Sequence, residues 1–226
     1  MNVSTVNIAI DGPSGAGKST IARIMAKRLG YLYVDTGALY RALGLALLEQ
    51  GVDIRDPEAV AARLPSLKVS LTHGETGQRV LVGERDVTDL IRTPEISMAA
   101  SAVSAQPAVR AFLLRLQQDL AERHDVIMDG RDIGTVVLPR AQIKIFLFAS
   151  AEDRADRRYA ELLEKGQSVT YQEVLADMKK RDWDDAHREI APLRPAEDAV
   201  LVDTTGYELP RSVERLYTLI KEKLEG

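Results

Sequence analysis

The first residues that could do chemistry form a glycine-rich run that ends in a lysine and hydroxyl side chains. The run matches the P-loop pattern G-x-x-x-x-G-K-S/T in full, and it lies between a predicted strand and a predicted helix. Glycines let the backbone turn tightly and aim its N–H groups at phosphate oxygens, and the helix start adds a positive end. We therefore predict a nucleotide-binding loop made of Gly12, Pro13, Ser14, Gly15, Ala16, Gly17, Lys18, Ser19 and Thr20.

A P-loop identifies a nucleotide site but not a reaction, because GTPases, motor ATPases and kinases share it. In a kinase, Lys18 would reach the β- and γ-phosphates and Ser19 would ligate Mg²⁺. The sequence has no N-K-x-D run with which a GTPase would read guanine. The nearest candidate for the acidic strand end of a machine ATPase is residues 126–129. A small-molecule kinase needs instead a second anion site and mobile arginines that close over the γ-phosphate.

Two arginine clusters are candidates for such a closing element. Arg154, Arg157 and Arg158 are spaced i, i+3 and i+4, which places them on one face of a predicted helix. Residues 181–188 form a second cluster of basic and acidic side chains, and the connector 164–168 between the clusters contains a glycine. A helix, a flexible turn and a second helix with these arginines would form a lid. The alternative is a solvated helical hairpin, since exposed charges often have no role.

The segments around these motifs indicate an α/β protein with a parallel central sheet. Apolar runs predict strands, apolar periodicity predicts helices, and the β-rich middle section predicts a hairpin whose turn spans residues 73–78. Residues 150–153 and 170–173 both fit a capping box, so each should begin a helix. The predicted strands are residues 6–11, 31–34, 67–72, 79–82, 125–129, 142–148 and 200–202, and the predicted helices include residues 18–29, 36–50, one opening at Pro107 and one carrying Leu209, Val213, Leu216, Tyr217, Ile220 and Leu224.

Composition narrows the class of protein. The 226 residues are 45% hydrophobic and 28% charged, which is typical of a soluble globular domain. A net charge of −4 argues against a protein that coats nucleic acid, and the absence of cysteine agrees with a reducing compartment. The start lacks a signal-peptide pattern, and the longest apolar stretch, residues 141–151, is too short to span a bilayer. We expect a cytoplasmic monomer that binds neither nucleic acid nor membrane.

Over nearly its whole length the chain resembles the bacterial cytidylate kinases. The matching motifs are residues 10–18, 35–41, 91–95, 129–137 and 191–193, together with the arginine clusters. The resemblance implies the P-loop nucleoside-monophosphate kinase fold, with a β-rich insert in the monophosphate-binding region and a helical lid. We therefore expect one kinase unit over residues 1–226, with a core at 1–63, 107–150 and 196–226, an insert at 64–106 and a lid at 151–195.

The resemblance also implies an activity, the transfer of a phosphoryl group from ATP-Mg to CMP or dCMP. Lys18, Arg181 and Arg188 would be the catalytic residues, with Mg²⁺ carried by the nucleotide. The acceptor would be held by Thr36, Arg41 and Arg131 at its phosphate, by Ser101, Arg110 and Asp132 at cytosine, and by Asp185 at the sugar. A carboxylate accepts from the cytosine N4 amino group, whereas uracil offers an acceptor there, and such a buried mismatch costs on the order of a few kcal/mol.

Some of these assignments have structural alternatives. Asp132 could pair with Arg131 as a structural salt bridge, and Ser101 could be an ordinary residue of the alanine-rich run 98–105. Thr36 stands where the family often has serine, but it keeps a hydroxyl. Trp183 and His187 are interpreted as packing or exposed residues. The rival functions are a P-loop kinase for UMP, AMP or shikimate, which the Asp132 and Arg110 pair disfavours, and a nucleotide-binding regulatory module without turnover.

Overall fold

The computed structural model describes residues 5–74 and 77–225, and the chain divides into two compact units. The first unit contains Met1–Leu32 and Asp125–Gly226, and the second contains Tyr33–His124. Among the described residues, no helix has both the length and the apolar character needed to cross a membrane. The expected division into core, insert at 64–106 and lid at 151–195 is a functional one and stays a prediction.

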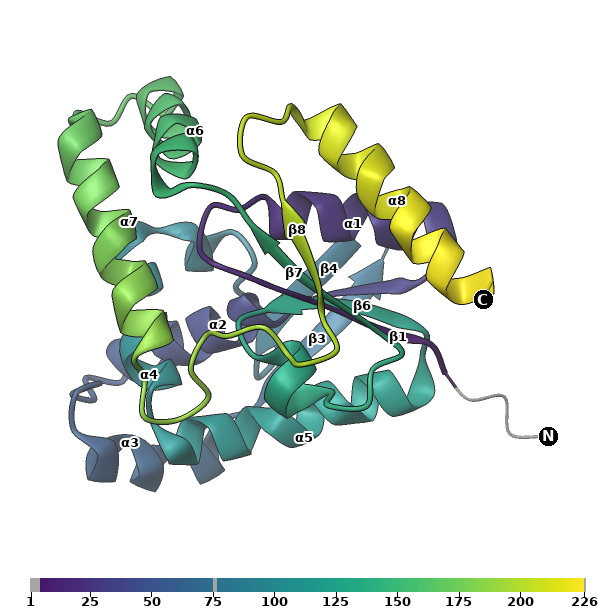
Figure 1. The fold of residues 1–226 in the computed structure, drawn as a ribbon. Helices are drawn as coiled ribbons and strands as arrows, with labels where there is room; N and C mark the ends of the chain where they lie inside the picture. Colours follow the sequence, from purple (N-terminus) through teal and green to yellow (C-terminus); the bar gives the residue numbers. More distant parts are fainter. Residues whose placement is uncertain (1–4, 75–76, 226) are drawn as a thin grey trace. The chain divides into compact units, whose positions relative to one another are not determined.

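A parallel sheet forms the centre of the first unit (Figure 1). Its strands β6 (Val126–Gly130), β1 (Asn7–Asp11), β7 (Ile143–Phe148) and β8 (Val200–Asp203) are adjacent in that order. At the β6 edge the Leu32 N–H, which begins β2 (Leu32–Asp35), donates to the Asp125 carbonyl. The apolar residues of β1 are fully buried, as expected of a central strand covered on both faces. The predicted parallel α/β sheet is confirmed, with strand ends shifted by a residue or two.

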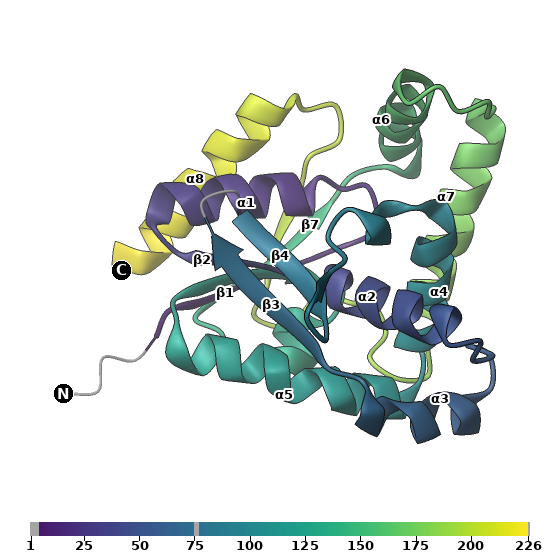
Figure 2. The ribbon, with the colours of Figure 1, turned by 180° about the vertical axis from the view of Figure 1, so that it is seen from behind.

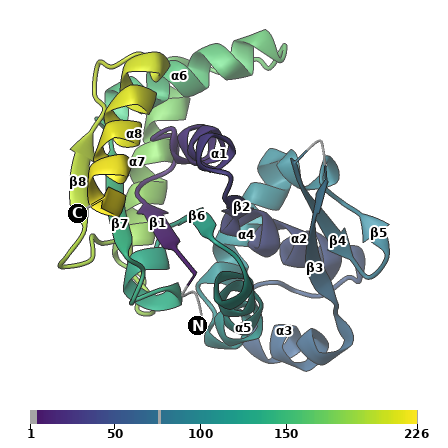
Figure 3. The same ribbon diagram turned by 90° about the vertical axis from the view of Figure 1, so that its right-hand side faces the viewer.

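Two helices lie side by side on one face of this sheet, α1 (Lys18–Leu29) and α8 (Leu209–Glu225) (Figures 1 and 3). Arg28 of α1 pairs with Glu214 of α8 at 2.7 Å and lies over the Tyr217 ring. In α8 the predicted apolar stripe is confirmed in part: Val213, Leu216 and Ile220 are buried, whereas Leu209 is largely exposed.

The remaining helices of the first unit, α6 (Ala151–Glu164) and α7 (Tyr171–Ala186), form a hairpin. Buried residues of both helices make a small apolar core between them. Thr170 and Glu173 form the predicted capping box in full. The other predicted box is only half formed: Ser150 accepts from the Asp153 N–H, but the short Asp153 side chain pairs with Arg157 one turn further on.

The second unit is built around α2 (Thr36–Glu49), whose apolar residues pack into a core shared by the rest of the unit (Figures 2 and 3). The other elements of the unit are α3 (Pro57–Arg63), the short turns Leu64–Ser66 and Leu90–Arg92, β3 (Val69–Gly74), β4 (Gly77–Val82), β5 (Arg85–Asp86), α4 (Pro94–Ser104) and α5 (Pro107–Arg123). Strands β3, β4 and β5 form an antiparallel sheet. The β-rich section and the helix at Pro107 are thus confirmed.

Three details of the second unit were not predicted. His73 and Gln78, assigned to a turn, lie opposite each other in the β3–β4 ladder, so the turn is shorter than expected and its residues 75 and 76 lie outside the described residues. Strand β5 is too short to give a sequence pattern. Helix α3 had a recognisable signal, because Asp56 caps it and Pro57 is its first residue.

Candidate active site

The P-loop joins β1 to α1 in a conformation that only glycine can adopt at its first position. Gly12 has φ +148°, and a Cβ there would lie 1.9 Å from the Leu147 carbonyl oxygen. Gly17, with φ +86°, takes the N-cap position of α1 without a side-chain cap, so the helix start presents backbone N–H groups. The local sequence therefore builds the anion cradle that the motif predicted.

Lys18 is held inside this cradle. Its side chain is buried, and its Nζ donates to the Pro13 carbonyl of the loop at 2.7 Å. Burial, together with the positive charge of the nearby Arg131, lowers the pKa of Lys18 to about 7, against the opposite influence of Asp129. A bound polyphosphate would supply the negative charge that favours the protonated lysine.

Ser19 and Asp129 form a pair of oxygen ligands beside Lys18. The Ser19 hydroxyl donates to Asp129 Oδ2 at 2.7 Å, at the end of β6 next to the P-loop strand. Hydroxyl and carboxylate oxygens are the donors that Mg²⁺ prefers. The described residues contain no group of three or more His, Cys, Asp or Glu side chains that could hold a metal ion. The sequence showed Asp129 as the nearest candidate for an acidic strand end, but Asp129 was not predicted as a site residue.

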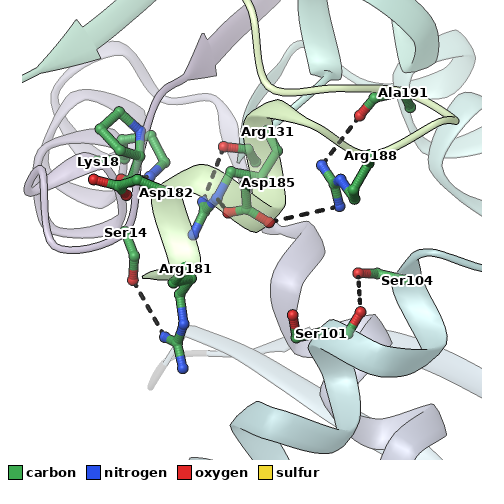
Figure 4. Close-up of polar contacts among 12 residues, drawn as sticks. Ser14, Lys18, Ser101, Ser104, Arg131, Arg181, Asp182, Asp185, Arg188 and Ala191 are labelled. Atoms are coloured by element: carbon green, nitrogen blue, oxygen red, sulfur yellow. Dashed lines mark hydrogen bonds and ion pairs between the residues drawn. The ribbon is translucent and has the colours of Figure 1, made fainter. Parts of the chain in front are cut away.

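Asp185 of α7 lies between two of the predicted arginines (Figure 4). It accepts from Arg131 Nε at 2.8 Å, and its other oxygen lies 3.8 Å from Arg188 Nη1. Arg188 also donates to the Ala191 carbonyl at 3.1 Å. The tertiary structure thus brings together the loop after β6 and the end of α7. Because Arg131 has Asp185 as a partner, pairing with Asp132 is not needed to neutralise it.

Arg181 points from α7 toward the P-loop (Figure 4). Its nearest polar contact there is a long one, 3.4 Å from Nη1 to the Ser14 hydroxyl. Burial lowers the pKa of Arg181, and the positive charges of Arg131 and Arg158 act in the same direction. This guanidinium is thus partly desolvated among other cations, which is an arrangement that an anion would stabilise.

Asp132 is buried and opens the turn Ile133–Val137. Asp11, the last residue of β1, fixes the start of this turn by accepting from the Ile133 and Gly134 N–H groups at 2.8 and 2.7 Å. Burial raises the pKa of Asp11 to about 6, although these two hydrogen bonds oppose the shift. Asp11 was also missed from the sequence, because its partners lie 122 and 123 residues away.

In the second unit, Thr36 and Arg41 lie on the first turns of α2. Asp35 caps this helix by accepting from the Ala38 N–H, and it also accepts from Arg41 Nη2 at 2.8 Å. Gln78 of β4 in turn accepts from the Asp35 N–H at 2.9 Å. Among the described residues, Arg41 Nε is buried without a hydrogen-bond partner, so this guanidinium retains donor capacity for an anion.

Ser101 and Arg110 are brought close through Ser104. The Ser104 hydroxyl donates to the Ser101 carbonyl at 3.0 Å (Figure 4), and the Ser104 carbonyl accepts from Arg110 Nη1 at 3.2 Å. Arg110 is buried, and its guanidinium lies 5.8 Å from the centre of the Tyr40 ring. Ser101 itself is exposed on α4, as either of its interpretations allows.

The three arginines of α6 lie on one helix, as predicted, but they differ in their surroundings. Arg154 is buried against the P-loop, whereas Arg157 and Arg158 are each more than a third exposed and pair with Asp153 and Glu161 of the same helix. On α7, Trp183 is exposed and stacks on His187 with ring centres 4.3 Å apart, which confirms the interpretation of both residues as packing or exposed.

The family model and the similar sequences agree on one family. The family model described as cytidylate kinase matches residues 8–222. The cytidylate kinase of Carboxydothermus hydrogenoformans is 51% identical, covering 96% of this chain and 98% of that protein. The cytidylate kinase of Caldicellulosiruptor saccharolyticus is 49% identical, covering 95% of each chain. A solved structure of an uncharacterized protein from Eubacterium ventriosum is similar in fold alone, with a TM-score of 0.55 and 11% identity over 96% of this chain and 99% of that one.

Proposed function

We propose that this chain, which belongs to the cytidylate kinase family, transfers the γ-phosphoryl group of ATP to CMP or dCMP and releases ADP with CDP or dCDP. The observation that carries the proposal is the family match from residue 8 to residue 222. The buried Lys18 in its glycine cradle and the cations on α7 support it. We place the reaction in the cytoplasm and expect the chain to act as a monomer.

The attacking group is an oxygen of the CMP phosphate, which needs no general base. The second pKa of a phosphate monoester is about 6, so this oxygen is already mostly an anion at neutral pH. The protein must therefore bring two polyanions together and offset the charge that moves between them. A water-excluding lid would also prevent transfer of the phosphoryl group to water.

On the donor side, Lys18 holds the β- and γ-phosphates, and Arg181 of α7 and Arg188, which follows that helix, approach the transferring group. Mg²⁺, held through Ser19 and the adjacent Asp129 with the nucleotide, would supply further positive charge at the phosphates. The depressed pKa values of Lys18 and Arg181 support this assignment, because both groups gain stability from a nearby anion.

On the acceptor side, membership of the family supports Thr36, Arg41 and Arg131 as the residues that hold the CMP phosphate. The unpartnered Nε of Arg41 supports this role, since a phosphate oxygen would satisfy it. Ser101, Arg110 and Asp132 recognise cytosine, and Asp185 binds the sugar hydroxyls. The burial of Arg110 and Asp132 favours discrimination, because a mismatched base would leave a buried polar group unsatisfied.

ADP release from ATP-Mg in the presence of single acceptors tests the proposal. The panel contains CMP, dCMP, UMP, AMP, GMP, dTMP and shikimate. We expect kcat/KM for CMP and dCMP to exceed all others by roughly tenfold or more, which is the discrimination one buried polar mismatch supplies. A preference for AMP or shikimate would disprove cytosine recognition but not kinase activity. ADP release that no acceptor increases would favour the regulatory module.

A further inference from the structure

Arg154 connects three separate segments of the first unit at the base of α6. Its Nε donates to the Ala149 carbonyl at 2.9 Å, where β7 passes into α6. Its Nη1 donates to the Ser14 carbonyl in the P-loop at 2.8 Å. Its Nη1 and Nη2 also form a bidentate salt bridge with Asp182 of α7, at 3.1 and 2.5 Å. One guanidinium therefore joins the end of β7, the phosphate loop and the second helix of the hairpin.

These contacts leave Arg154 unsuited to contact a nucleotide. Its side chain is 4% exposed, and all three guanidinium nitrogens already donate to acceptors of the chain. Its charge is also neutralised by Asp182 at hydrogen-bond distance. A phosphate would have to replace these partners, and breaking a buried charge pair is costly because it leaves one charge unpaired.

Packing on the same side of the P-loop supports a fixed position for α7. A Cβ on Gly15 would lie 2.8 Å from Met178 Cε and 3.4 Å from Arg154 Cβ, so the loop contacts both helices closely. Met178 also belongs to the apolar core between α6 and α7, which lets the hairpin behave as one body. The hairpin thus meets the P-loop through the apolar Met178 side chain and through the hydrogen bond of Arg154 to the Ser14 carbonyl.

Asp182 adjoins Arg181, the α7 arginine that reaches toward the P-loop. Ser14 is contacted twice by this region: its carbonyl accepts from Arg154, and its hydroxyl lies 3.4 Å from Arg181 Nη1. A shift of α7 relative to the loop would therefore change the place of Arg181 directly. Catalysis by positioned charges is sensitive to such shifts, and a misplacement of about 1 Å can cost about 100-fold in rate.

We propose that Arg154 is a positioning residue that fixes α7 against Ser14 of the P-loop, so that Arg181 lies where the phosphoryl group is transferred. This inference deepens the proposed function and rests on it. It differs from the prediction that Arg154 belongs to a mobile arginine lid, because here Arg154 contacts the protein alone. The essential property is the fork of the guanidinium, which spans three acceptors, and not only its positive charge.

Arg154→Lys tests whether the branched guanidinium is needed, since lysine keeps the positive charge but cannot bridge the three segments. We expect kcat to fall about 10- to 100-fold while the KM for CMP stays within about twofold, because the acceptor-binding residues are unchanged. Arg154→Gln should lose kcat to a similar extent. Asp182→Asn should lose less, because the carbonyl contacts of Arg154 remain, and combining it with Arg154→Gln should add little.

Lys179→Gln is the matched control. Lys179 of α7 pairs with Glu152 of α6 at 2.8 Å, so it also joins the two helices, but both side chains are more than half exposed. Its kcat should equal that of the parent. Full activity of Arg154→Lys would overturn the proposal, since charge alone would then suffice. A loss that merely follows the folded fraction, measured by circular dichroism, would overturn it as well.

A readout independent of turnover separates this proposal from the proposed function. Trp183 is the only tryptophan of the chain and follows Asp182 on α7. Time-resolved anisotropy of its fluorescence should show added segmental motion in Arg154→Gln and none in Lys179→Gln. If the parent lacks cytidylate kinase activity but this difference appears, the proposed function is wrong, whereas the fixing of α7 by Arg154 is supported. Identical anisotropy in all three proteins would refute the fixing of α7 by Arg154.

Discussion

The cations around the P-loop and the cations on the outer part of α6 differ in what surrounds them. Lys18 and Arg181 are largely buried near Arg131, and each has its pKa lowered by burial and by that positive neighbour. The side chains of Arg157 and Arg158 are each 38% exposed, and each pairs with a carboxylate within one turn of its own helix. Both groups would look alike as arginine and lysine clusters in the printed sequence.

This difference teaches how to tell a binding site from a solvated charge cluster. Burying like charges together raises the free energy of the ligand-free protein, and a polyanion lowers it again. An exposed pair within a helix contributes only about 0.3–0.5 kcal/mol and needs no ligand. The comparison predicts strong effects for substitutions beside the P-loop and weak effects for substitutions on the outside of α6.

The largest effect should come from Lys18→Ala. Lys18 is the P-loop side chain that places a positive charge beside the transferred phosphate, so we expect kcat to fall by roughly 100- to 1,000-fold or more. Steady-state ADP release measures the loss, and circular dichroism shows whether the fold is kept. Turnover within a few-fold of the parent would contradict the assignment of Lys18 to the transferred phosphate.

Arg188→Ala should come next. Arg188 is expected to act chiefly in the transition state, so kcat should fall about 10- to 100-fold with a modest change in KM. Arg41→Ala is the contrasting variant, because Arg41 should bind the CMP phosphate in the ground state and its loss should raise the KM for CMP. Kinetics with varied CMP at saturating ATP compare the two. A normal kcat in the Arg188 variant would make its contacts with Asp185 and Ala191 structural and not catalytic.

A substitution of the buried Asp132 extends the comparison from positively charged side chains to a negatively charged one. Asp132→Asn replaces an acceptor-only carboxylate by an amide that can also donate to the uracil O4. The ratio of kcat/KM for CMP to that for UMP should fall by roughly tenfold, with little change in the KM for ATP. The ratio is measured with both acceptors under one set of conditions. An unchanged ratio would make Asp132 a structural residue.

The pKa of Lys18 predicts a smaller, pH-dependent effect. The group titrates at about 7 in the ligand-free protein, and bound ATP should raise its pKa by favouring the charged form. ATP affinity should therefore be full below pH 7 and decline as the pH rises through the pKa of the complex. Calorimetry at pH 7.5 in buffers of different ionisation enthalpy should detect uptake of part of a proton. Lys18→Arg, which does not titrate in this range, should show less uptake.

The smallest effect is expected for Arg158→Ala. Its side chain is exposed and pairs with Glu161 of the same helix, so kcat should change less than about twofold and stability by less than about 0.5 kcal/mol. ADP release and urea denaturation measure both. A tenfold loss of kcat would indicate that Arg158 acts as part of the predicted lid. The two groups of cations would then not differ in function.

Local sequence determined a large part of this protein. The P-loop follows from glycines and a lysine at fixed spacing, because backbone torsions and the start of a helix are set by neighbouring residues. The bounds of α1 and the cap of α7 at Thr170 were predicted for the same reason. Gly12 shows how strict this local rule is, since its φ of +148° is a backbone torsion that other residues rarely adopt.

Tertiary structure alone decided which charged groups meet. Asp129 pairs with Ser19 across 110 positions, and Arg154 meets Ser14 across 140, so no spacing rule could reveal either contact. Helical periodicity placed Arg154, Arg157 and Arg158 on one face, but their burial depends on what packs against that face. The type of residue gives the charge of a side chain, whereas its solvation and its partners depend on segments that only the folded chain brings together.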